Sequence, residues 1–125
     1  MEKKAGQKIV SGEVQGDERR LEMARFLGAD YCLDVSKEDP VKKVQEITNG
    51  EMADMVMDVT GRPKEAINAL DLVKKEGTGV LPGLYGAAKE VPLILDKVVL
   101  NEIRLHGVYS HDLTAVAPAI EIVEL

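Results

Sequence analysis

Three side chains of the sequence could ligate a transition metal, and they are Cys32, His106 and His111. Zinc in proteins is held by four ligands in structural sites and by three protein ligands in catalytic ones. A single cysteine and two histidines do not form a recognised zinc motif. We therefore predict that this segment binds no metal.

Each of these residues also has an ordinary structural explanation. Cys32 lies inside an apolar stretch and is predicted to be a small core residue. His106 alternates with apolar neighbours, as a sheet residue does. His111 precedes an expected helix, where it would help the helix begin. We assign a catalytic role to none of them.

Tyr85 and Lys89 have the Tyr-x-x-x-Lys spacing that serves proton transfer in short-chain dehydrogenases. A helix would place both side chains on one face, and the lysine would lower the pKa of the tyrosine. Gly86 and Pro92 disfavour a long helix at this place, and no glycine-rich loop precedes it. We therefore interpret the spacing as incidental.

The segment Gly77-Thr78-Gly79, with Gly83 after it, resembles a loop that cradles the phosphates of a dinucleotide. Such a loop must follow a strand and open a helix, because the helix N-terminus faces the pyrophosphate. Here the expected order is helix, glycines, strand. We predict that these glycines form a helix C-cap and a turn.

The composition is that of an ordinary globular protein of one domain. The chain has 125 residues, of which 45% are hydrophobic, 30% charged and 3% aromatic, and its formal net charge is -6. This charge disfavours nucleic acid and anionic membranes as partners, since both attract basic surfaces. No run approaches the roughly 18 apolar residues of a membrane-spanning helix. The single cysteine and the absence of an apolar signal segment after Met1 favour a cytoplasmic location.

Short apolar strands alternate with helical segments along the chain. Asp17 and Asp39 are expected helix N-caps, and Pro40 and Pro63 are expected first helical positions. This alternation predicts an α/β fold with a doubly wound parallel sheet and helices on both faces. We expect strands at 8–14, 29–35, 53–59, 79–84 and 103–109, an extended edge segment at 91–95, and helices at 17–27, 40–48, 63–75, 96–102 and 112–125.

Ligands of such sheets bind beyond the carboxyl ends of the strands. Asp58 is bracketed by apolar residues, as expected where a buried strand ends and opens onto a site. The other residues expected at this working edge are Gly12, Val35, Thr60-Gly61, Gly83-Leu84 and Val108-Tyr109-Ser110.

Four stretches follow one another in a consistent order. They are Ile9-Val10-Ser11-Gly12 with 17–24 and 27–30; Asp39-Pro40-Val41 with Asn49-Gly50; 53–56 with Thr60-Gly61; and 83–86 with Val91-Pro92-Leu93. Together they resemble the zinc-dependent medium-chain alcohol and polyol dehydrogenases, among which sorbitol, butanediol and threonine dehydrogenases are the closest in character. The likeness covers nearly the whole chain, so it is more specific than any single motif.

The resemblance implies that residues 1–125 are a partial Rossmann cofactor-binding domain. In that family a catalytic domain with the zinc ligands comes first, followed by the strand and glycine loop that bind the pyrophosphate, and neither has a counterpart here. That first strand is the centre of the order 3-2-1-4-5-6, so its absence would leave the strands near Ile9 and Met55 about 9 to 10 Å apart. We expect that these strands close up directly, that a partner chain fills the slot, or that the piece is stable only within a larger protein.

The resemblance also implies which residues face an NAD or NADP cofactor near the adenosine ribose. These are Ser11, Gly12 and Arg20, with Glu13 and Asp17 within reach. A carboxylate would bind the ribose hydroxyls of NAD, whereas Arg20 would bind the 2′-phosphate of NADP. Both cofactors remain open.

Further along the chain, the implied contacts are made by backbone rather than by side chains. Thr60 and Gly61 would line the adenine and ribose side of the cofactor. The segments implied to hold the nicotinamide carboxamide contain Pro82, Gly83, Leu84, Val108 and Ser110. None of these residues transfers protons, so the resemblance implies no catalytic residue in this chain.

The function implied is that of a fragment of an NAD(P)-dependent oxidoreductase that oxidises a secondary alcohol or polyol. Cofactor binding is expected to be weak or absent, because pyrophosphate affinity comes mainly from the missing glycine loop. Zinc-assisted oxidation is expected to be absent from the chain alone. The resemblance further implies a homo-oligomer joined through residues 91–95 (Val91-Pro92-Leu93-Ile94-Leu95). The alternatives are a non-catalytic adenine-nucleotide module and a structural or oligomerising remnant.

Overall fold

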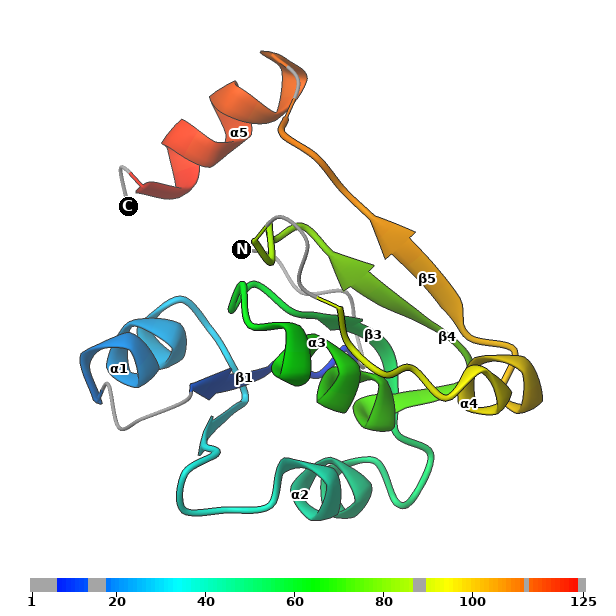
Figure 1. The fold of residues 1–125 in the computed structure, drawn as a ribbon. Coiled ribbons are helices and arrows are strands. Elements are labelled where there is room, and N and C mark those ends of the chain that lie inside the picture. Colours follow the sequence, from blue (N-terminus) through cyan, green and yellow to red (C-terminus); the bar gives the residue numbers. More distant parts are fainter. Residues whose placement is uncertain (1–6, 14–17, 87–89, 112, 124–125) are drawn as a thin grey trace. The chain divides into compact units, whose positions relative to one another are not determined.

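The computed structural model describes residues 7–13, 18–86, 90–111 and 113–123 (Figure 1). The chain divides into two compact units, one made of Met1–Lys43 with Ala117–Leu125 and the other of Val44–Val116. Each unit has its own parallel sheet. Parallel strands flanked by helices confirm the predicted α/β class.

The first unit contains a strand, a helix and a second strand in the predicted order. Strand β1 (Val10–Glu13) lies parallel to β2 (Tyr31–Asp34), and α1 (Glu18–Phe26) packs on both strands. The buried hydrophobic side chains of this layer are Leu21 of α1 and Leu33 of β2.

Helix α2 (Pro40–Ile47) begins where the sequence predicts. The Asp39 carboxylate accepts hydrogen bonds from the backbone N–H of Val41 at 2.9 Å and of Lys42 at 3.4 Å. These are the donors that an N-cap side chain satisfies, and Pro40 occupies the first helical position, where no donor is needed. Asp39 is therefore confirmed as the helix cap.

The second unit is built on three parallel strands in the order β3, β4, β5. They are β3 (Ala53–Met57), β4 (Val73–Leu81) and β5 (Arg104–Gly107). The helices of this unit are α3 (Pro63–Ala69), which is continued by the 3-10 turn η1 (Leu70–Leu72), and α4 (Leu95–Leu100). Leu70 of η1 packs over Gly79 of β4, where a Cβ would lie 3.1 Å from its side chain. Helix α5 (Leu113–Val123) follows β5 and includes residues of both units.

The structure corrects the prediction for residues 70–79. The helix expected to run to Lys74-Lys75 ends at Ala69, and Val73 already pairs with Ala53 as the first residue of β4. Gly77 and Gly79 therefore lie within a strand, and the prediction of a helix C-cap was wrong. Residue 73 is buried and residue 74 forms an ion pair with Asp54, so pairing with β3 outweighs the local helical pattern.

The structure also corrects the expected edge segment. Residues 91–94 belong to no strand, and Leu95 begins α4. The edge strand next to β4 on the side away from β3 is β5, and residues 91–94 add no strand to the sheet. Pro92 has no backbone N–H to donate to a ladder, which removes one of the bonds that an edge strand would need.

Among the described strands, β1 pairs only with β2, and β3 pairs only with β4. The three expectations for the missing central strand, namely direct pairing of the strands near Ile9 and Met55, a partner chain in the slot, or stability only within a larger protein, stay predictions. No described helix is both long enough and apolar enough to cross a membrane.

Candidate functional site

A buried carboxylate lies at the carboxyl end of β3. Asp58 directly follows the strand and is only 6% exposed. Its backbone N–H donates to the carbonyl oxygen of Val80 in β4 at 3.1 Å, which continues the ladder one residue beyond the strand. The side chain is thereby placed at the end of the sheet where ligands of parallel α/β proteins bind.

The two oxygens of the Asp58 carboxylate accept hydrogen bonds from two different loops. The hydroxyl of Tyr85, in the loop after β4, donates to Oδ2 at 3.0 Å and also lies 3.3 Å from the Asp58 carbonyl oxygen. The backbone N–H of Thr60, in the turn after β3, donates to Oδ1 at 3.2 Å. Sequence reasoning placed Asp58 at the end of a strand but did not find its partner Tyr85.

The same two loops approach each other through glycines. Gly61 has φ +65°, and a Cβ there would lie 3.3 Å from the carbonyl oxygen of Leu84. A Cβ on Gly83 would lie 3.6 Å from Cα of Gly61 and 3.5 Å from the ring carbon Cζ of Tyr85. Of the predicted cofactor-facing residues, the structure thus brings Gly61, Gly83 and Leu84 together.

The remaining predicted residues of this unit lie at the neighbouring strand end. The backbone N–H of Val108 donates to the carbonyl oxygen of Leu81 at 3.1 Å, so the chain beyond β5 starts beside the loop that begins with Pro82. Ser110 is exposed and has φ 63°. Carboxyl ends of β3, β4 and β5 therefore form one edge, and we call residues 58–61, 82–85 and 108–110 the rim.

Tyr85 is a hydrogen-bond donor in this arrangement. Burial, together with the adjacent Asp58 carboxylate, raises the pKa of Tyr85 to about 12. A tyrosine that serves as a proton acceptor needs the opposite shift. Lys89, the other member of the Tyr-x-x-x-Lys spacing, lies outside the described residues. The interpretation of that spacing as incidental therefore stays a prediction.

In the first unit, the predicted ribose-side residues lie at the end of β1 and on α1. Ser11 and Gly12 belong to β1, and a Cβ on Gly12 would lie 3.4 Å from the side chain of Val35. The guanidinium of Arg20 lies 3.7 Å from the carboxylate of Glu13. The carboxylate of Glu13, which would favour NAD, and the guanidinium of Arg20, which would favour NADP, are therefore paired with each other.

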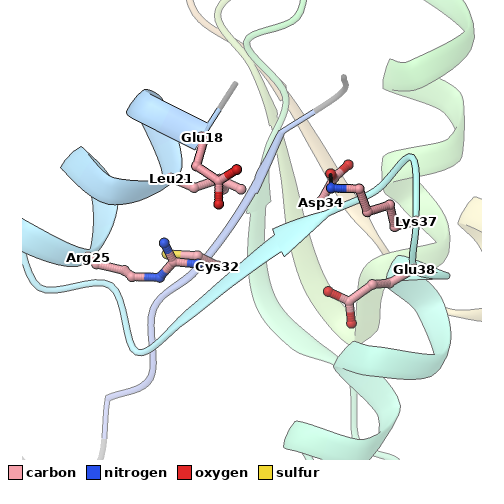
Figure 2. A pocket seen from close by; sticks show the side chains of 7 residues that line it. All are labelled: Glu18, Leu21, Arg25, Cys32, Asp34, Lys37 and Glu38. Carbon is pink, nitrogen blue, oxygen red and sulfur yellow. Dashed lines mark ion pairs between the residues drawn. The ribbon is translucent and has the colours of Figure 1, made fainter. Parts of the chain in front are cut away.

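A polar pocket missed by sequence reasoning also lies in this unit (Figure 2). The half-buried Cys32 borders it and so does not belong to a closed core, in contrast to the prediction. The pocket has a volume of about 140 Å³, which is below the roughly 300 to 1,000 Å³ of typical ligand sites. The lining residues are Glu18, Leu21, Arg25, Cys32, Asp34, Lys37 and Glu38.

Asp34 at the end of β2 is the most strongly perturbed carboxyl of the pocket. Its carboxylate accepts hydrogen bonds from the backbone and hydroxyl of Ser36 and forms an ion pair of 2.7 Å with Lys37. The hydrogen bond with Lys37, followed by that from Ser36, lowers the pKa of Asp34 to about 2. An acidic residue two positions before a serine was the sequence signal for this turn.

A zinc ion does not fit the described part of the chain. No three side chains of His, Cys, Asp or Glu gather there in a way that could hold a metal ion. A dinucleotide has a better fit, since the rim lies at the carboxyl ends of parallel strands, where such ligands bind.

Known proteins resemble the chain over most of its length. A Mycobacterium tuberculosis protein assigned as an alcohol dehydrogenase is 37% identical over 120 residues, which are 94% of this chain and 32% of that protein. D-arabitol-phosphate dehydrogenase of Enterococcus avium is 34% identical over 88% of this chain and 31% of its own length. L-threonine 3-dehydrogenase of Symbiobacterium thermophilum is 34% identical over 85% of this chain and 30% of its own. The chain thus spans about a third of the length of these relatives.

Solved structures share the fold. Alcohol dehydrogenase from Thermotoga maritima superimposes with a TM-score of 0.83 over 94% of this chain and 33% of its own, at 21% identity. A Sinorhizobium meliloti 1021 protein solved with NADP superimposes with a TM-score of 0.80 over 94% of this chain and 34% of its own, at 18% identity.

The family model described as zinc-binding dehydrogenase matches residues 2–124, which is nearly the whole sequence. Together with the identities to curated relatives and the parallel sheets flanked by helices, this match shows that the chain belongs to the zinc-binding dehydrogenase family.

Proposed function

We propose that this chain is the cofactor-facing part of an NAD(P)-dependent oxidoreductase that oxidises a secondary alcohol or polyol, and that residues 1–125 act as one partial Rossmann domain. The observation that carries the proposal is the rim, where Asp58 holds two loops together at the carboxyl ends of parallel strands. Relatives named for arabitol phosphate, sorbitol and threonine support an alcohol or polyol as substrate.

The rim would meet the cofactor through its backbone. The turn at Thr60 and Gly61 would line the adenine and ribose side, while the residues Pro82, Gly83, Leu84, Val108 and Ser110 would hold the carboxamide of the nicotinamide. Ser11, Gly12 and Arg20 would lie near the adenosine ribose. Because Arg20 pairs with Glu13, either NAD or NADP remains compatible with that end.

The chain alone would bind the cofactor weakly and would not oxidise alcohol. The described residues offer no cluster for zinc, and none of the rim residues assigned to the cofactor is a proton-transfer side chain. When bound, zinc supplies a Lewis acid that polarises the alcohol oxygen. Its ligands would come from other segments of the parent enzyme. The single cysteine favours the cytoplasm as its compartment.

Titration of the chain with NADH and NADPH, followed by amide resonances, tests this proposal. We expect shifts that concentrate in the rim and saturate only at millimolar nucleotide. Sorbitol and threonine should not be oxidised by the chain with NAD or NADP. Micromolar affinity without turnover would instead favour a non-catalytic nucleotide-binding module. Shifts that avoid the rim would refute the proposal.

We also propose that residues 91–95 take part in a homo-oligomer. Val91 is 39%, Ile94 69% and Leu95 67% exposed, and on the following helix α4 Val99 is 69% exposed. Contiguous exposed apolar residues are typical of interaction sites. Sedimentation over a range of concentrations should show dimers that Ile94→Asp abolishes, whereas the control Leu113→Asp, at a residue 89% exposed, should leave them intact. Monomers at all concentrations would contradict this.

A further inference from the structure

Two loops that leave adjacent strands depend on one buried carboxylate. The turn after β3 contributes the N–H of Thr60, and the loop after β4 contributes the hydroxyl of Tyr85. The two donors are 25 residues apart in the sequence, since Tyr85 follows Asp58 by 27 positions and Thr60 follows it by 2. Only the folded chain can bring both to Asp58.

The carboxylate has a physical need for these donors. Asp58 is 6% exposed, and a buried charge without hydrogen bonds costs far more than an exposed one. Removing one donor leaves part of that cost unbalanced, whereas water can replace a donor at an exposed carboxylate. The bond from Tyr85 therefore holds the loop after β4 more firmly than a surface hydrogen bond would.

The glycines make the contact close. A Cβ at position 61 would lie 3.3 Å from the carbonyl oxygen of Leu84, a tight approach, whereas one at position 83 would be in ordinary van der Waals contact with the ring of Tyr85. The Tyr85 ring thus lies beside Gly83 while its hydroxyl reaches Asp58. The Tyr85 side chain thus joins the loop after β4 to the carboxylate at the end of β3.

We propose that Asp58 and Tyr85 form a positioning pair, whose hydrogen bond holds the loop after β4 against the turn after β3 and sets the spacing at which the backbone of Gly61 and Gly83 faces a dinucleotide. The identity of the ligand rests on the proposed function, whereas the coupling of the two loops does not. Neither residue is assigned a chemical step.

Amide hydrogen exchange on the full chain tests the coupling. Tyr85→Phe keeps the ring beside Gly83 and removes only the hydroxyl donor. It should accelerate exchange about tenfold or more at 60–61 and at 83–86, as expected when a hydrogen bond to a charged acceptor is lost. Tyr31→Phe, a matched loss of a hydroxyl in the other unit, should leave both segments unchanged.

A double-mutant cycle separates a pair from two independent effects. If Asp58→Asn and Tyr85→Phe act through the same bond, the double variant should exchange no faster at 83–86 than the more severe single variant. Unchanged exchange at both segments in Tyr85→Phe would overturn the proposal. So would acceleration spread evenly over β3, β4 and β5, because it would show general loosening of the unit.

Measurements of dinucleotide binding separate a failure of the positioning role from a failure of the proposed function. With NADH as the probe, Tyr85→Phe should weaken binding several-fold, while exchange in the strands stays at the native rate. If NADH perturbs no rim amide of the unchanged chain, the proposed function fails, and the exchange comparison still decides whether the two loops are coupled. If NADH binds equally to both proteins, the positioning role is overturned.

Discussion

The hydroxyl of Tyr85 donates a 3.0 Å hydrogen bond to the carboxylate of Asp58, which lies 27 positions earlier in the chain. This hydrogen bond joins the loop that follows β4 to the turn that follows β3. The surroundings of the Tyr85 hydroxyl raise its pKa, and this shift can be measured directly.

Tyr85 should ionise at a higher pH than an ordinary tyrosine. Burial and the neighbouring carboxylate raise its pKa from 10.0 to about 12, so the folded state holds the proton more tightly than the unfolded state does. The resulting stabilisation is complete below pH 10 and is lost as the pH rises towards 12. The difference in tyrosinate absorbance between the native chain and Tyr85→Phe should show this titration. A midpoint near pH 10 would contradict the structure.

Asp34 should make the protein sensitive to acid. The hydrogen bond with Lys37 lowers the pKa of Asp34 from 3.8 to about 2, so its stabilisation is present above pH 4 and is lost as the pH falls towards 2. Urea unfolding should therefore show a stability difference between the native chain and Asp34→Asn at pH 6 that shrinks at pH 2. Lys37→Met removes the main cause and should move the midpoint of acid loss upwards. Equal acid profiles for all three proteins would refute this assignment.

Gly77 should not tolerate a side chain. A Cβ there would lie 2.7 Å from the side chain of Val73 and 2.8 Å from the carbonyl oxygen of Lys74. Gly77→Ala should lower the free energy of unfolding by about 1 to 3 kcal/mol, as overpacking does. The control is Gly107→Ala in β5, where nothing lies within 4 Å and the change should stay within about 0.5 kcal/mol. Similar losses in both variants would argue against a steric cause.

Asp39 should stabilise α2 through its cap. Asp39→Ala removes the acceptor of the N–H groups of Val41 and Lys42 and should cost about 1 kcal/mol of unfolding free energy. Glu38→Ala changes the charge equally one residue earlier and should cost no more than about 0.5 kcal/mol. The two values come from chemical denaturation at neutral pH. A loss shared equally by the two variants would point to charge rather than to capping.

The alternation of strands and helices could be predicted because its signals are local. Asp39 and Pro40 mark the start of α2 whatever lies around them, and the carboxyl ends of the strands follow from the direction of the chain. The sequence by itself therefore determined the α/β class and most of the residues of the rim.

Tertiary structure decided where local preferences were outweighed. Residues 73–76 continue a helical pattern, yet pairing of Val73 with Ala53 makes them part of β4, because a strand gains its hydrogen bonds from a neighbour that is distant in sequence. For the same reason the partner of Asp58 remained hidden. A buried carboxylate needs donors, but only folding places the hydroxyl of Tyr85 within reach.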